Sequence, residues 1–469
     1  MSDVSPRYTD IPSGTVHRTI GLLHGALTRL HADMDDRRIE GIGVMVHRAM
    51  STQQRTFHTP EHIFDLSDPE NPHTTLAAIF HDIVYYQVDD GFLEEIAALL
   101  DPYISCTDGS VTLKREIDPG DRAFWGCAAV FAFEPGQTLS PFGGLNEFLS
   151  ALVMDRLLEG TVADRDLLIA TACIEATIPF RRPDSEGRRP PEILRERIAA
   201  TNDAFGLGLS EADIDETVRA SVCFSNQDVG NFSESDPGRF LDNTWKLLPE
   251  SNPSLRLSGL YTIASYSTAL MKMEGFLSSL RADDVFNRFR DYPDADTYRQ
   301  LIERTAFNLA IARRYLGIKM ISIAILRALA DLTGGDAPVA FFMGDIDPRD
   351  DRSSLVSHLP PQPAGCIRGD DEMNDLFRLL KHGRASSSRF DLQNSPLSLY
   401  VHQCLDEDDQ LRCIEASKEF LTGARSAEEF LDTVPAHLVA GIARAAGVMA
   451  FTRGEQLRDI ARRYERQER

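Results

Sequence analysis

Hydrophobic side chains recur at helical spacing through most of the chain. Ile20, Leu23 and Leu27 fall on one face, and residues 145–153 repeat the same pattern. Residues 167–178 are apolar nearly all round, which is typical of a buried helix. We find no alternating strand pattern longer than four or five residues and no repeat of fixed period. The pattern therefore predicts an all-α fold.

Breaks in the helical pattern predict how the chain is divided. Residues 87–143 are less regular and look like an insertion, with one helix near 93–100, a turn-rich CTDGS piece and an apolar stretch at 124–133. The proline-containing segment 249–253 is the predicted boundary between a domain at 1–250 and a C-terminal helical domain at 254–469. In the second domain we expect helical stretches at 255–280, 297–332, 407–421, 427–431 and 435–466.

Helix-start signals frame the chemically interesting part of the chain. Thr59 and Pro60 suit the N-cap and first position of a helix. Thr74 or Thr75 is expected to begin the next helix, which runs through the apolar sequence LAAIFHDIVYY. His58 and His62 are four residues apart, so on a helix they would share a face.

Composition narrows the classes of partner. The 469 residues hold 49 Lys plus Arg and 72 Asp plus Glu, a formal net charge of -23. Such a surface repels nucleic acid and anionic membrane, but it does not exclude a small anionic substrate held at a local site. The seven cysteines are scattered and lack a CxxC spacing, so we expect reduced thiols. No signal-peptide pattern and no apolar run of about 20 residues is present, so we expect a cytoplasmic protein.

The sequence FHDIVY places His81 and Asp82 side by side within an apolar run. Burying an imidazole beside a carboxylate is unfavourable unless something compensates, and a divalent metal ion accepts both groups. His62 on the preceding helix could reach the same ion, and a fourth ligand is expected from a later helix. Nitrogen and oxygen ligands without thiolate suit one ion of Mn, Fe, Mg or Zn in an open site.

Three segments occur in order: Arg55-Thr-Phe-His58 followed by His62, then Phe80-His-Asp-Ile-Val-Tyr85, then Asn146-Glu-Phe-Leu-Ser-Ala151. Together they resemble the R-x-Y-H-x-x-x-H, F-H-D-x-V-Y and N-E-x-x-S-A segments of a bacterial group within the HD-domain superfamily of metal-dependent phosphohydrolases. The resemblance covers residues 15 to 245. Phe57 stands where the group has tyrosine, and the histidine that follows a later A-T pair in the group is absent here.

The resemblance implies a bundle of helices around a metal ion. His62, His81 and Asp82 would be ligands, and the superfamily's last ligand is an aspartate on a late helix. We assign that role to Asp228. The weaker candidates for the same role are Asp155, Asp213 and Asp215.

Further residues are candidates for substrate chemistry. His58 could contact a phosphate or assist proton transfer, and it could equally support the site indirectly. Glu147 and Glu175 lie on otherwise apolar helices, so each could orient a water molecule or be neutralised by an arginine. Arg181 and Arg182 could hold an anionic substrate or be solvated.

Taken together, these features predict a metal-dependent phosphohydrolase that acts on a small phosphorylated molecule such as a nucleotide. The C-terminal helices would support a homodimer or shape the substrate site. The alternative is a catalytically inactive HD-fold binding or regulatory protein. An HD-type oxygenase would need two irons and more histidines, and only His58 is spare.

Overall fold

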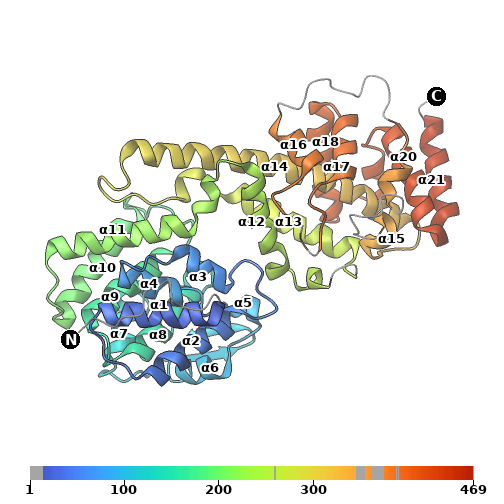
Figure 1. The fold of residues 1–469 in the computed structure, drawn as a ribbon. Helices are drawn as coiled ribbons and strands as arrows, with labels where there is room; N and C mark the ends of the chain where they lie inside the picture. Colours follow the sequence, from blue (N-terminus) through green and yellow to red (C-terminus); the bar gives the residue numbers. More distant parts are fainter. Residues whose placement is uncertain are drawn as a thin grey trace. The chain divides into compact units, whose positions relative to one another are not determined.

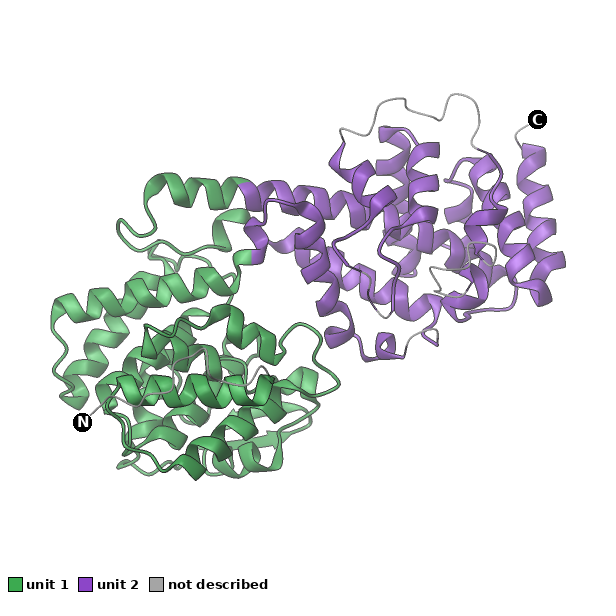
Figure 2. Ribbon diagram, viewed as in Figure 1, with its two compact units in different colours: residues 1–230, 281–303 green, residues 231–280, 304–469 purple. Residues whose placement is uncertain are grey.

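The computed structural model describes residues 14–257, 260–344, 354–361, 374–386, 388 and 390–467. Helices dominate this part of the chain (Figure 1), which confirms the all-α prediction at the level of fold class. The chain forms two compact units (Figure 2): residues up to 230 together with 281–303, and residues 231–280 together with 304–469. The segment 249–253, where we expected a boundary, lies within the second unit, and Pro249 is inside a helix.

The first unit is a bundle whose centre is helix α9. In chain order its helices are α1 (Thr15–Arg29), α2 (Asp36–Met50), α3 (Pro60–Leu66), α4 (Pro72–Phe80), α5 (Tyr86–Asp89), α6 (Glu94–Leu100), α7 (Arg122–Phe131), α8 (Leu145–Leu158), α9 (Asp164–Ala176), α10 (Pro190–Phe205) and α11 (Glu211–Asp228). Helix α9 contacts α4, α8, α10 and α11. It is apolar nearly all round because neighbours cover it on several sides.

The segment 87–143, expected as an insertion, adds a small sheet and a core helix. Strands β1 (Ile104–Thr107) and β2 (Ser110–Leu113) form a hairpin, and β3 (Thr138–Leu139) pairs with β2. The hairpin turns at Asp108-Gly109, both with positive φ, as a two-residue turn requires. Phe124 and Phe131 of α7 lie 6.3 and 5.4 Å from the ring of Phe148, so this segment shares the core of the unit.

The second unit is also helical. Its elements are α12 (Pro237–Ser251), α13 (Ile263–Ser279), most of α14 (Ala295–Leu332), α15 (Val339–Met343), α16 (Asp375–His382), α17 (Pro396–Cys404), α18 (Glu407–Leu421), α19 (Ala427–Leu431), α20 (Ala436–Met449) and α21 (Gly454–Gln467). The stretch expected at 435–466 is broken into two helices by a short turn at Phe451–Arg453. Helices α20 and α21 pack closely there. Glycine permits this approach, because a Cβ on Gly454 would lie only 2.7 Å from the carbonyl oxygen of Gly447.

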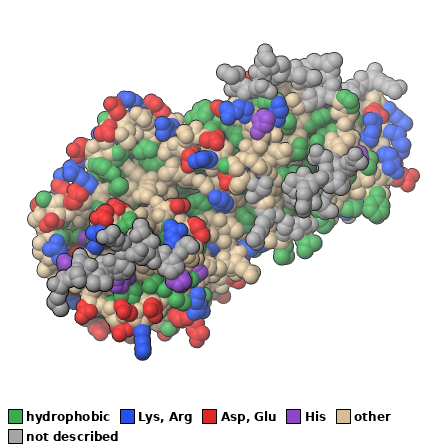
Figure 3. All heavy atoms as spheres, viewed as in Figure 1, with side chains coloured by type: hydrophobic (Ala, Val, Ile, Leu, Met, Phe, Trp, Pro, Cys, Tyr) green, Lys and Arg blue, Asp and Glu red, His purple; other side chains and the backbone are tan. Residues whose placement is uncertain are grey.

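Charges of both signs are interspersed on the visible face of the described surface (Figure 3). The excess of acidic residues is therefore spread over this face rather than gathered into one field. Among the described helices, none combines the length and the hydropathy needed to cross a membrane. The six cysteines within the described ranges are free, and Cys366 lies outside them.

A buried ionic cluster joins α12, α13 and α14 of the second unit. One carboxylate oxygen of Asp391 accepts hydrogen bonds from Lys319 Nζ at 2.8 Å, Trp245 Nε1 at 2.8 Å, Tyr266 OH at 3.0 Å and Arg384 Nη1 at 3.3 Å. Burial alone would raise the pKa of Asp391, but the charges of Lys319 and Arg384 outweigh it and hold the pKa below its usual range. The two cations depend on this one carboxylate, because both are buried.

Replacing Asp391 with Asn should therefore lower the free energy of unfolding of the second unit by roughly 3–5 kcal/mol, since two buried cations lose their counter-charge. Urea unfolding followed by Trp245 fluorescence, in a Trp125→Phe background, measures this change. The control Glu415→Gln removes an exposed charge and should change stability by less than about 0.5 kcal/mol.

The wild type and the Asp391→Asn variant should also differ in acid. The contribution of Asp391 is present above its unfolded pKa of about 4 and is lost as the pH falls toward its lower folded pKa. The unfolding free energy of the Asp391→Asn variant should fall less over this range. Equal acid responses of the two proteins would contradict the role of the cluster.

Candidate metal centre

Four side chains predicted as ligands converge at one point of the first unit. His62 comes from α3, His81 and Asp82 follow α4, and Asp228 is the last residue of α11. Helix α3 begins as predicted, with Thr59 at the N-cap and Pro60 first. The expected start of α4 at Thr74 or Thr75 was wrong: it begins at Pro72, where Asn71 accepts hydrogen bonds from two backbone N–H groups.

The ligand atoms of His62, His81 and Asp82 all lie within 4.8 Å of one another, which suits a single ion, whereas Asp228 lies beside His62 but outside this group. His81 Nε2 lies 2.9 Å from Asp82 Oδ2, and His62 Nε2 lies 3.0 Å from Asp228 Oδ1. The two remaining nitrogen–oxygen separations, His62 to Asp82 and His81 to Asp228, are 3.7 and 3.9 Å. Metal–ligand bonds of about 2.1 Å place neighbouring ligand atoms about 3.0–3.4 Å apart in octahedral or tetrahedral geometry. The observed separations bracket this range.

His81 is oriented for coordination through Nε2. Its Nδ1 lies 3.1 Å from the carbonyl oxygen of Ala78, to which it donates a hydrogen bond. In the neutral imidazole, this bond fixes the tautomer in which Nε2 carries the lone pair. Nε2 is buried and makes no hydrogen bond, although Asp82 is close. A buried, unsatisfied ring nitrogen that faces carboxylates fits a metal ligand.

The charges within the cluster also favour a bound cation. Burial lowers the pKa of His81, but Asp82 and Asp228 outweigh burial and raise it to about 9. Burial raises the pKa of Asp82, but His81 and His58 outweigh burial and hold that pKa well below its usual range. Positive charge is therefore strongly favoured at this point, whether it is carried by a proton or by a metal ion.

Arg55 holds the turn that carries Asp82. Its Nη1 donates to the carbonyl oxygen of Asp82 at 2.6 Å, while Nε and Nη2 make a bidentate pair with Asp89 at 3.0 and 2.6 Å. The arginine side chain is fully buried. In the sequence, Arg55 stands out only as the first residue of the motif that continues to His58. The buried bidentate pair with Asp89 explains why an arginine occupies this position.

The Asn146–Ala151 segment secures the same turn from the other side. Ser150 Oγ accepts a hydrogen bond from the backbone N–H of Val84 at 3.1 Å. Asn146 Oδ1 accepts one from the N–H of Tyr86 at 3.1 Å. Both donors follow the end of α4, where no helical acceptor is available. The asparagine and serine of this segment thus fix the backbone just beyond His81 and Asp82.

Glu147, in the first turn of α8, lies within electrostatic range of the cluster. Burial raises its pKa to about 7, and the negative charges of Asp82 and Asp228 add to this effect. Its Oε2 is buried without a hydrogen-bond partner. A carboxyl group whose pKa is near 7 and responds to Asp82 and Asp228 is suited to proton transfer.

His58, a further residue predicted from the sequence, lies at the edge of the cluster. His58 lies in the bend before α3, not on the helix face we expected, because α3 begins at Pro60. Its ring is nevertheless 6.0 Å from that of His62 and 4.7 Å from that of Tyr85. His58 thus remains at the edge of the cluster.

Glu175 and the two arginines form ion pairs that include none of the four candidate ligands. Arg181 Nη1 lies 2.5 Å from Glu175 Oε1, and Arg197 also bonds to this buried carboxylate, at 3.2 Å. Arg182 is largely exposed and lies 3.4 Å from Asp284. Glu175 is therefore neutralised by arginines, the alternative that its sequence context had left open.

The segment 281–303 reaches the end of α11, which sequence reasoning did not anticipate. Asn226 and Asn287 exchange hydrogen bonds between side chain and backbone at 2.8 and 2.7 Å. Asn287, Val229 and Arg181 line a small cavity of about 10 Å³ beside the helix end that carries Asp228. No local sequence signal could have found this contact, because 61 residues separate the two asparagines.

Comparison with known proteins adds no relative. No protein-family model matches the chain, and no curated protein or solved structure matches it. Among the described residues, the group of metal-type ligand atoms that lie within 4.8 Å of one another is His62, His81 and Asp82. Inference about function therefore depends on this site and on the resemblance of the three ordered segments.

Replacing Ser150 with Ala should lower the free energy of unfolding by roughly 1–3 kcal/mol, because the buried N–H of Val84 loses its acceptor. Urea unfolding and hydrogen exchange at the Val84 amide measure the change. The matched control is Ser221→Ala, since the Ser221 hydroxyl is equally buried but donates to its own helix, to the carbonyl of Thr217. Similar losses in both variants would refute the specific role of Ser150.

Proposed function

We propose that the protein is a metal-dependent phosphohydrolase that hydrolyses a phosphate ester of a small molecule. The observation that carries this proposal is the convergence of two imidazoles and two carboxylates around the unsatisfied Nε2 of His81. The three ordered segments that resemble the HD superfamily support the same reading. They supply His62, His81 and Asp82, whose ligand atoms lie within 4.8 Å of one another, and Glu147, whose pKa is raised in part by Asp82.

The ligand set fits one divalent ion with an open side. His81 is almost fully buried, while 11% of the His62 side chain and 18% of each aspartate side chain are exposed. A substrate could therefore approach from the exposed side. When bound, the ion would polarise a phosphoryl oxygen and lower the pKa of a bound water molecule.

The residues of the chain have separate tasks in this proposal. Glu147 accepts a proton from the attacking water, and the proton passes to the oxygen of the departing alcohol as the P–O bond breaks. His58, at the edge of the cluster, contacts the phosphate. Arg55 and Ser150 keep Asp82 and the following backbone in place. The products are an alcohol and inorganic phosphate.

A second candidate function is a metal-binding or regulatory protein without turnover. The pairing of Arg181 with Glu175 favours it, because an arginine expected to hold the phosphate is already engaged. The two candidates share the metal centre and differ in hydrolysis. Metal binding and phosphate release must therefore be measured separately.

Purified protein should bind about one equivalent of a divalent metal, measured by elemental analysis after dialysis against Mn, Fe, Mg or Zn. Changing His81 or Asp82 to Ala should abolish this binding. The control His73→Ala should retain the metal, because His73 pairs with Asp166 outside the cluster. Wild-type protein that takes up none of these ions would rule out both candidate functions.

Replacing Glu147 with Gln should keep the metal and lower the hydrolysis rate by about 10²–10⁴-fold, because the proton acceptor is lost. Phosphate release from nucleotides, sugar phosphates and p-nitrophenyl phosphate measures the rate. The wild-type rate should fall in acid with a midpoint at or below pH 7, since a bound cation lowers the pKa of Glu147 from its value of about 7. Metal-loaded protein that hydrolyses none of these esters would favour the binding role.

A further inference from the structure

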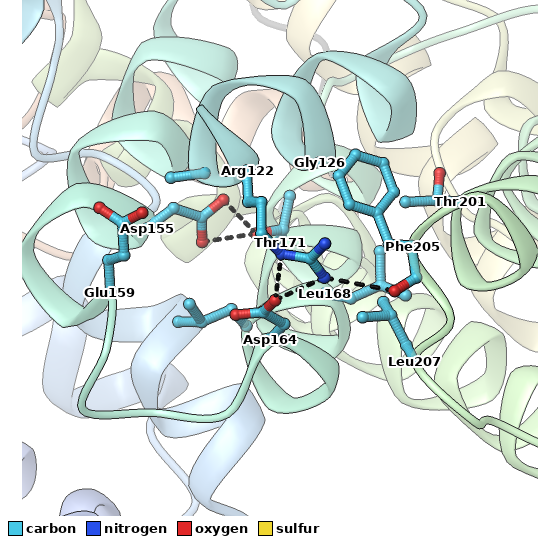
Figure 4. A pocket seen from close by; sticks show the side chains of 12 residues that line it. Arg122, Gly126, Asp155, Glu159, Asp164, Leu168, Thr171, Thr201, Phe205 and Leu207 are labelled. Carbon is cyan, nitrogen blue, oxygen red and sulfur yellow. Dashed lines mark hydrogen bonds and ion pairs between the residues drawn. The ribbon is translucent and has the colours of Figure 1, made fainter. Parts of the chain in front are cut away.

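A cavity of about 80 Å³ lies in the first unit among α7, α8, α9 and α10 (Figure 4). A single water molecule needs roughly 10–15 Å³ on this scale, so the cavity has room for a molecule of several heavy atoms. Asp155, which lines it, follows Glu147 by eight residues on α8. That spacing corresponds to about 12 Å along the helix axis. The cavity is thus separate from the candidate metal centre.

Asp155 is buried without a counter-ion. Asp155 is 4% exposed. The Thr171 hydroxyl lies 3.0 and 3.2 Å from its two carboxylate oxygens. One hydroxyl proton serves one oxygen at a time, whereas a carboxylate offers about four acceptor sites. Within the described ranges, no lysine, arginine or histidine pairs with Asp155. The group therefore lacks donors on its cavity side.

The rest of the lining indicates the charge of a ligand. Arg122 is already engaged, because its Nε donates to Asp164 at 2.8 Å and its Nη2 donates to the carbonyl of Phe205 at 3.2 Å, as Figure 4 shows. Glu159, a further carboxylate of the lining, is paired with Arg156 at 2.6 Å, so Asp155 is the carboxyl group of the lining that has no counter-ion among the described residues. Burial raises the pKa of Asp155 well above its usual range, and Asp164 and Glu159 add to this effect. An anion is disfavoured here, and a cation beside Asp155 would stabilise its ionised form.

The walls of the cavity indicate that the ligand also has an apolar part. Leu167, Leu168 and Leu207 line it, together with the ring of Phe205. A hydrated inorganic cation would leave these apolar surfaces without contact. A cationic head with a short hydrocarbon tail would use both the carboxylate and the walls.

We propose that this cavity binds a small primary alkyl- or arylammonium ion. The ammonium donates hydrogen bonds to Asp155, and the hydrocarbon packs against Leu168 and Phe205. Binding converts a poorly satisfied buried carboxyl group into a paired carboxylate. This site does not depend on the proposed phosphohydrolase function.

Isothermal titration of the full-length protein with n-butylammonium and benzylammonium chloride tests the proposal. n-Butanol and benzyl alcohol serve as neutral ligands of similar shape, and potassium chloride serves as the inorganic cation. The ammonium ions should bind at least about tenfold more tightly than the alcohols, because hydrogen bonds to a charged group are the stronger kind. Potassium should not displace them.

Two variants locate the binding. Asp155→Asn removes the charge at nearly constant shape. Gly126→Leu fills the cavity and leaves Asp155 intact: a Cβ at Gly126 meets no atom within 4 Å, and leucine favours the helix more than glycine does. Both variants should weaken binding about tenfold or more. The control Asp203→Asn, which changes an exposed aspartate of α10, should bind as the wild type does.

Several results would overturn the proposal. Wild-type protein that binds neither ammonium ion has no such site. Equal binding of ammonium ions and alcohols would indicate an apolar cavity without charge recognition, and displacement by potassium would indicate an inorganic cation. Undiminished binding to the Gly126→Leu variant, with its fold verified by circular dichroism, would place the ligand elsewhere.

Discussion

The concentration of charge at the end of α4 is the constraint on which the first unit depends. Helix α4 is buried along most of its length, so the imidazole and carboxylate that follow it emerge inside the bundle and not at its surface. Two carboxylates and two imidazoles then share a small space, and each ionised group is stabilised only by the others or by a cation. A positive charge bound at the cluster is therefore strongly stabilised, and the two carboxylates repel each other when no positive charge is present.

The surroundings of the cluster hold it by hydrogen bonds to the backbone. Arg55 binds the carbonyl of Asp82 from one side, and Ser150 and Asn146 accept the N–H groups of Val84 and Tyr86 from the other. Side chains with rigid hydrogen-bonding geometry are suited to this task, because small displacements of a ligand weaken a metal site. The motif residues that are not ligands are thereby explained by the backbone groups they satisfy.

Buried carboxyl groups elsewhere in the chain differ in how their negative charge is compensated. Asp391 is surrounded by two cations and two aromatic donors, so its charge is compensated by the protein itself. Glu175 is compensated by Arg181 and Arg197. Asp155 has one hydroxyl donor and an adjoining cavity. This difference in compensation separates structural carboxylates from those that leave room for a ligand.

The sequence alone determined the helical class, because hydrophobic spacing reports directly on which face of a helix is buried. Several helix bounds followed from caps and turn residues, such as Thr59 and Pro60, and the candidate ligands His62, His81, Asp82 and Asp228 were also chosen from sequence. Only the tertiary structure decided how the other buried carboxylates are compensated. Glu147 and Glu175 look alike in sequence, but helix packing pairs Glu175 with arginines and leaves the buried Oε2 of Glu147 without a hydrogen-bond partner. The return of 281–303 to the first unit and the cavity beside Asp155 were likewise beyond sequence reasoning, because both depend on contacts between segments far apart in the chain.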